Sequence, residues 1–180
     1  MNLYLVRHGV AYDHGDPAFP NDDDRPLTPD GRKKFRKAAV GLFEMVDPLA
    51  VILTSPLPRA AQTAEILHEV AGDKARLALS DAMRPRGSFD RVVNDCMSQI
   101  NGAGPPGEEN EVQGRGIALV GHAPTIGLLG AWLLNGDAAR FSLDLRKGGA
   151  ACIEFDGMPE AGRGNLVWML TQGMLRKMAG

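Results

Sequence analysis

Arg7, His8 and Gly9 directly follow a short apolar run, Leu3 to Val6, which has the length and composition of a buried strand. A guanidinium and an imidazole at the end of a buried strand are costly to desolvate unless a ligand binds beside them. In open α/β sheets, ligands bind at the carboxyl ends of the strands. The pattern therefore predicts that His8 is a nucleophile and that Arg7 holds the anion it attacks.

Two further predicted strands lead into similar chemistry. Residues 50–54 form an apolar run that continues into Ser55 and a helix with Arg59 in its first turn. Residues 117–120 form another run, which is followed by His122 near a helix start. Arginine forks match phosphate oxygens in pairs and stay charged, and a helix N-terminus attracts anions. Two arginines and two histidines at strand ends therefore indicate a phosphoryl site, in which the arginines keep the nucleophilic imidazole neutral.

Each of these side chains also has a purely structural explanation. A single histidine is more often a satisfied structural group than a catalyst, and Arg59 alone could be a helix surface residue. His14, in a loop, and His68, on a helix, fit that explanation. His8 and His122 differ from them because each follows a buried strand and adjoins a glycine.

Other chemistries lack their motifs in this sequence. It has no GxxxxGK[ST] phosphate loop, no GxSxG serine elbow and no HExxH zinc motif. The acidic run from Asp22 to Asp24 lacks the ligand spacing of a metal loop, so a solvated loop is favoured over a metal site. We therefore expect no metal and no cofactor, and catalysis by a histidine nucleophile.

Composition and length predict one globular domain over residues 1–180. Hydrophobic residues make up 44% and charged residues 23%, as in ordinary globular proteins. The formal net charge of −2 argues against a nucleic acid as partner. No apolar run reaches membrane-span length and no signal peptide precedes the first strand, so we expect a cytoplasmic protein without membrane contact. Cys96 and Cys152 lie outside any CxxC pattern, which favours reduced core thiols.

Helical and strand patterns alternate along the chain, which positions the candidate site. Thr28 and Pro29 form a helix start, and the predicted helix runs to about Val46. Ser55 is expected to cap the next helix, and residues 101–116 read as a flexible Gly/Pro-rich surface loop. The first helix has a basic face, most simply a solvated one and, as a minority interpretation, a dock for an acidic protein surface. Its basic residues are Arg32, Lys33, Lys34, Arg36 and Lys37.

The run Leu5-Val6-Arg7-His8-Gly9 resembles the signature of the histidine phosphatase superfamily, and the chain is similar to its small SixA-type phosphohistidine phosphatases. Further elements of that branch follow in order. They are RPLTPDG at 25–31, SP with RAAQTA at 55–64, VGHAP at 120–124 and KGGA at 147–150. The resemblance implies a three-layer α/β/α sandwich with a mixed, mainly parallel sheet of about six strands.

The resemblance also implies roles for the four site residues. His8 would be the phosphorylated nucleophile, and Arg7, Arg59 and His122 would form the phosphate pocket around it. In that mechanism His8 attacks phosphorus in line, and water then hydrolyses the phosphohistidine. The implied substrate is a phosphorylated histidine on a phosphorelay protein. A small-molecule phosphatase or mutase of the same superfamily and a non-catalytic phosphate-binding module remain alternatives.

The sequence departs from the wider superfamily where many members place a glutamate general acid. That region reads SDAMRP at 80–85, in which Asp81 is the nearest candidate acid and an ordinary turn residue is the equal alternative. A phosphoramidate such as phosphohistidine needs less acid catalysis, because its nitrogen readily accepts a proton. A mutase would need a second anion site, for which Arg84 and Arg86 are the evident spare cations. The chain also lacks long helical insertions over the site, and an open pocket suits a phosphorylated protein surface.

Overall fold

The fold is seen in a computed structural model that describes residues 1–72, 75–101 and 116–180. Its six-stranded sheet has the order β3-β2-β4-β1-β5-β6. The strands are β1 (Asn2–Arg7), β2 (Leu49–Thr54), β3 (Arg76–Leu79), β4 (Gly116–Gly121), β5 (Ala150–Glu154) and β6 (Asn165–Leu170). The helices are α1 (Pro29–Phe43), α2 (Pro58–Ala71), α3 (Phe89–Asn101), α4 (Thr125–Asn135) and α5 (Gln172–Met178), with short 3-10 turns η1 (Asp22–Asp24) and η2 (Asp81–Met83).

Four neighbouring strands of the sheet run parallel to one another, and one of the two remaining strands runs antiparallel to its neighbours. Strands β1, β4, β2 and β3 pair parallel in turn, while β5 pairs antiparallel with β1 and β6. The register sets Arg7 opposite Gly121 and Thr54 opposite Val120. The carboxyl ends of β1, β2 and β4 therefore lie at one edge of the sheet, as the strand-end argument requires.

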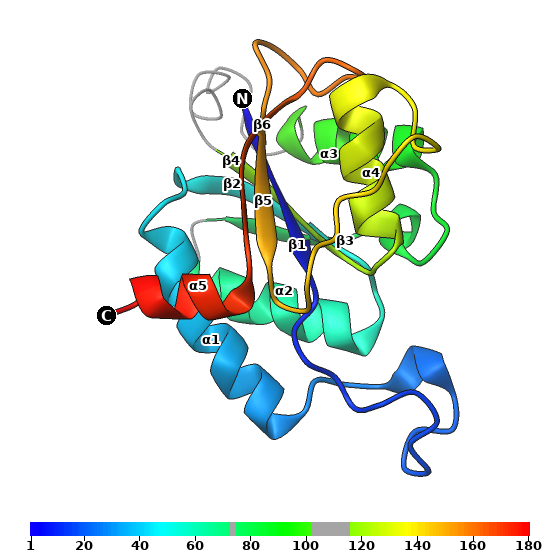
Figure 1. Cartoon of the computed structure of the whole chain (residues 1–180), viewed down its shortest axis with the longest axis vertical. Helices are drawn as coiled ribbons and strands as arrows, with labels where there is room; N and C mark the ends of the chain where they lie inside the picture. The colour runs from blue at the N-terminus through cyan, green and yellow to red at the C-terminus, as the bar shows by residue number, and fades with distance from the viewer. Residues whose placement is uncertain (73–74, 102–115) are drawn as a thin grey trace.

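Helices cover both faces of the sheet (Figure 1). One face packs against α1, α2 and α5, in a core that contains Phe35, Leu67 and Leu175. The other packs against α3 and α4, in a core that contains Cys96 and Leu129. This three-layer α/β/α arrangement with a mixed, mainly parallel sheet confirms the predicted fold class.

The start of α1 fits closely against the segment that follows His8. The Thr28 side chain accepts a hydrogen bond of 2.9 Å from the Gly31 N–H, as its predicted cap role requires. A Cβ atom at Gly31 would lie 2.0 Å from the Val10 carbonyl oxygen, so only glycine allows this approach. The helix ends at Phe43, earlier than the predicted end near Val46.

The prediction that Ser55 caps α2 is wrong. Helix α2 begins at Pro58, and its N-cap Leu57 makes no side-chain cap bond. Ser55 lies three residues before the helix, and its Oγ pairs instead with the His122 ring. Because the two residues are far apart in the sequence, no local pattern predicts this contact. Pro58, rather than Pro56, supplies the fixed φ at the helix start.

The predicted Gly/Pro-rich surface loop at 101–116 falls, over residues 102–115, outside the described residues; Asn101 ends α3 and Gly116 begins β4. Within the part of the chain that the structure describes, no helix is both long and apolar enough to span a bilayer. The Cys96 and Cys152 side chains are both buried, as predicted, and neither forms a disulfide.

Candidate active site

His8 is held by main-chain bonds to two neighbouring segments. Its N–H donates to the Gly121 carbonyl of β4 at 3.0 Å, and its own carbonyl accepts the Gly148 N–H at 2.9 Å. Gly148 has a φ of 71°, and a Cβ there would lie 2.4 Å from Gln172 Nε2. The glycines after Lys147 therefore let this loop close against the end of β1, where His8 remains only 7% exposed.

The hydrogen bonding of the His8 ring fixes which nitrogen can attack a substrate. Nδ1 lies 2.7 Å from the Gly9 carbonyl oxygen, which can only accept. Nδ1 must therefore carry the proton, and Nε2 keeps its lone pair. Burial, together with the charges of Arg59, Arg7 and Lys147, lowers the pKa of His8 to about 4, although the Gly9 hydrogen bond opposes this shift. The ring is thus neutral at pH 7, which is the form in which an imidazole can act as a nucleophile.

Thr63 joins the loop that follows His8 to α2. Its Oγ1 accepts the Gly9 N–H at 3.0 Å and donates to the Arg59 carbonyl at 2.6 Å. Gln62 instead accepts the Leu27 N–H at 2.8 Å, in the segment that leads into α1. Thr63 therefore ties Arg59 to the His8 loop, whereas Gln62 supports the neighbouring loop.

Arg59 is a buried cation, with 3% of its surface exposed. Its guanidinium donates to the Asp22 carbonyl at 2.7 Å and to the Asp22 carboxylate at 3.2 Å. Burial lowers the pKa of Arg59, and the Asp22 charge opposes that shift. Asp22 is thus part of the site, although sequence reasoning assigned it to a solvated loop. No spacing rule links a residue of η1 to α2, because only the tertiary fold brings them together.

Arg7 is partly buried and donates to the Leu145 carbonyl at 2.9 Å. Among the described residues, Arg7 Nε and Arg59 Nε are buried donors without an acceptor. A bound anion with several oxygens supplies acceptors of the kind that such guanidinium donors take. The phosphate-binding role predicted for the two arginines would use these donors.

His122 lies across from His8, with the ring centroids 5.2 Å apart. Its Nε2 is 2.9 Å from Ser55 Oγ, and its Nδ1 is buried without a partner in the described part of the chain. Burial, with smaller contributions from His8 and Arg59, lowers the pKa of His122 to about 3. His122 is therefore neutral in the free protein and can donate one N–H, while a bound anion would favour its protonated form.

Asp81 occupies a different environment from these four residues. It lies in η2 with 76% of its side chain exposed and pairs with Arg84 Nε at 2.8 Å. No hydrogen bond or ion pair joins it to Arg7, His8 or Arg59 among the described residues. No group of three or more metal-ligating side chains gathers anywhere in the described ranges.

The fold and the site together define a class: an α/β protein with two buried histidines and two arginines at the carboxyl edge of its sheet. A family model described as "Histidine phosphatase superfamily (branch 1)" matches residues 3–86. An uncharacterized protein of Picosynechococcus sp. (strain PCC 7002) is 34% identical over 149 residues, which cover 83% of this chain and 82% of that protein. The chain therefore belongs to branch 1 of the histidine phosphatase superfamily, and its chemistry is that of a phosphatase of that superfamily.

Solved structures share this fold. The protein histidine phosphatase SixA complexed with tungstate superposes with a TM-score of 0.69 at 24% identity, covering 97% of this chain and 99% of that one. A mycobacterial glucosyl-3-phosphoglycerate phosphatase complexed with VO3 superposes with a TM-score of 0.64 at 18% identity, covering 94% and 99%. These likenesses show a common fold, which relatives with different substrates use.

Proposed function

We propose that the protein is a phosphohistidine phosphatase, which removes the phosphoryl group from a histidine of a phosphorylated protein. The observation that carries the proposal is the fixed tautomer of His8, whose Nδ1 proton is held 2.7 Å from the Gly9 carbonyl. Nε2 is then the only ring nitrogen that can attack phosphorus. We propose that Arg7, Arg59 and His122 bind the equatorial oxygens, where charge spreads in the transition state.

The reaction takes place in two displacements. In the first, His8 Nε2 forms a bond to phosphorus while the bond from phosphorus to the substrate imidazole breaks, and that imidazole takes up a proton. In the second, water attacks phosphorus, the bond to His8 Nε2 breaks, and inorganic phosphate leaves. The proton lost by water balances the one taken up by the leaving imidazole. No metal takes part in either step of this scheme.

The two carboxyl groups near the site are poorly suited to protonate a leaving group, which favours a substrate whose leaving group is a nitrogen. Burial alone would raise the pKa of Asp22, but its hydrogen bond to Arg25 and the charges of Arg25 and Arg59 lower it. Asp22 is therefore a poor proton donor near neutral pH, and it acts on the site by holding Arg59. Asp81 stays a candidate donor to oxygen leaving groups, although it would have to leave its ion pair with Arg84. An imidazole leaving group is basic enough to take its proton from water.

Parallel assays with a phosphohistidine protein and a phosphomonoester test the proposal. We expect rapid phosphate release from the protein, slow release from the monoester, and loss of both in His8→Ala. His68→Ala is the matched control, because His68 lies on α2 outside the site. Rapid hydrolysis of a phosphosugar alone would favour the small-molecule alternative. Phosphate binding without turnover of any substrate would favour a binding module.

A further inference from the structure

We propose that Arg86 is a specificity residue that binds a carboxylate beside the phosphohistidine of the substrate protein. The proposal rests on the proposed function and names the substrate class more closely, as an acidic segment around the phosphorylated histidine. The structure separates Arg86 from Arg84, the other spare cation of the same loop.

The backbone of Arg86 is anchored close to His122. Its N–H donates to Thr125 Oγ1 at 3.0 Å. Thr125 is the first residue of α4, and the next residue, Ile126, donates its N–H to the His122 carbonyl at 2.8 Å. Arg86 therefore contacts the helix turn that follows His122, at the same edge of the sheet as the nucleophile. A side chain as long as that of arginine can span one such turn, of about 5.4 Å.

The Arg86 backbone is held in a conformation that suits glycine. Its φ of 65° is the only positive φ of a non-glycine residue in the described ranges. The next residue must be glycine, because a Cβ at Gly87 would lie 1.8 Å from the Ala82 carbonyl oxygen. A glycine at 86 would relieve the strain. Arginine is less favourable than glycine for this backbone conformation, so the reason for an arginine here lies in its side chain.

The charge of Arg86 is available for a ligand, whereas the charge of Arg84 is not. Arg84 pairs with the Asp81 carboxylate at 2.8 Å and lies 3.8 Å from that of Asp23. Arg86 is exposed, and no ion pair joins it to any of the described residues. Of the two cations, only Arg86 is thus free to take a carboxylate from outside.

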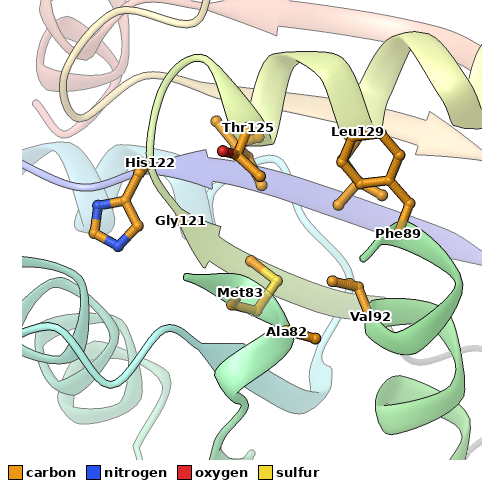
Figure 2. A pocket seen from close by; sticks show the side chains of 9 residues that line it. Ala82, Met83, Phe89, Val92, Gly121, His122, Thr125 and Leu129 are labelled. Atoms are coloured by element: carbon orange, nitrogen blue, oxygen red, sulfur yellow. The ribbon is translucent and has the colours of Figure 1, made fainter. Parts of the chain in front are cut away.

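A narrow apolar cleft is lined in part by His122 and by Thr125, the residue whose Oγ1 accepts the Arg86 N–H. Met83, Phe89, Thr125 and Leu129 are among its lining residues, and the His122 ring points away from them (Figure 2). The apolar lining offers few competing hydrogen bonds and lowers the local dielectric constant, which strengthens a charge pair at its rim. In the proposed complex, carbon atoms of the bound peptide pack on this lining.

The test uses two phosphohistidine peptides that differ only in one neighbour of the histidine, Glu in one and Gln in the other. Variants Arg86→Gly and Arg86→Lys are compared with Arg163→Gly. Arg163 is an exposed loop arginine just before β6, at the opposite edge of the sheet from the site. The readouts are kcat, KM and the thermal midpoint of each variant.

For Arg86→Gly we expect the KM of the Glu peptide to rise roughly fivefold, as for the loss of a rim ion pair, with little change in kcat. The KM of the Gln peptide should not change, the thermal midpoint should not fall, and Arg86→Lys should keep part of the preference. Equal Glu-to-Gln ratios in wild type and Arg86→Gly would overturn the role of Arg86 while leaving phosphohistidine turnover intact. A third outcome separates the two proposals: neither peptide is hydrolysed, but a small phosphorylated carboxylic acid is, and its KM rises in Arg86→Gly. That result would support carboxylate binding by Arg86 and contradict a protein substrate.

Discussion

At the scale of single residues, the site depends on where protons and charges are fixed. The Gly9 carbonyl holds the proton of His8 Nδ1 at 2.7 Å, which leaves Nε2 for attack. Asp22 holds the Arg59 guanidinium through two acceptors. In the proposed mechanism these contacts orient the nucleophile and one anion-binding guanidinium before any substrate arrives, and such preorganised charge is usually the largest single contribution to catalysis.

Removal of the Arg59 guanidinium should lower the turnover rate strongly. We expect Arg59→Ala to lower kcat by about 10²–10³, the effect typical of losing one donor to transition-state charge. Initial rates at saturating substrate measure this loss. Arg36→Ala is the control, because Arg36 is an exposed residue of α1 that pairs with Glu69. Equal kcat values for the two variants would remove Arg59 from the phosphate pocket.

The two buried histidines should make folding stability depend on pH. In the unfolded chain each titrates near 6.5, whereas in the folded protein the pKa of His8 is about 4 and that of His122 is about 3. Between pH 6.5 and 4 the unfolded state binds more protons, so stability falls as pH falls, by up to about 1.4 kcal/mol per pH unit for each histidine. Urea unfolding at pH 7, 6 and 5 measures this slope.

The variant His8→Gln provides the comparison for that slope. It lacks one of the two depressed pKa values, so its unfolding free energy should depend less steeply on pH than that of the wild type. Identical slopes would mean that His8 titrates alike in the folded and unfolded states. The pKa of His8 would then not be lowered by burial.

At the scale of elements, the approach of α1 to the nucleophile loop decides how firmly the site is held. Gly31→Ala would put a Cβ 2.0 Å from the Val10 carbonyl oxygen, so the helix start must move. We expect the free energy of unfolding to fall by roughly 1–3 kcal/mol, with reduced activity. Gly157→Ala is the matched control, because its Cβ would meet nothing within 4 Å. Denaturant unfolding of both variants checks the prediction, which fails if Gly31→Ala is as stable as its control.

Local patterns predicted the helices and strands well but not their tertiary partners. Apolar runs marked β1, β2 and β4, and Thr28 with Pro29 marked the start of α1, because these signals depend on residues close in sequence. The contacts of Ser55 with His122 and of Asp22 with Arg59 span 67 and 37 residues, so no local signal contains them. The sequence therefore predicted which candidate residues gather at one edge of the sheet, but not the contacts that Asp22 and Ser55 make with them.

At the scale of the whole molecule, the parallel strands bring residues from distant segments to one edge of the sheet. Strand β1 lies between β4 and β5 in the sheet, which puts His8 beside the loop after β4 and the loop before β5 (Figure 1). Both faces of the sheet are covered by helices, so the carboxyl edge is where substrate can reach these strand ends.

Both thiols should be unreactive in the folded protein. Burial raises the pKa of Cys96 to about 12 and that of Cys152 to about 11, so almost no thiolate is present at neutral pH. We expect slow modification by a disulfide reagent in buffer and rapid modification of both thiols in denaturant. Activity should be the same with and without a reducing agent. Fast labelling of the native protein would contradict the burial of these side chains.

In the proposed mechanism, His8 Nε2 carries the phosphoryl group during turnover. The most direct measurement is a rapid quench of the protein with a labelled phosphohistidine protein, followed by peptide mass spectrometry under alkaline conditions that preserve phosphohistidine. We predict acid-labile phosphate on the peptide that contains His8, and none on that peptide in His8→Ala, which should not turn over. Turnover by His8→Ala, or phosphate trapped on another residue during turnover, would contradict the claim.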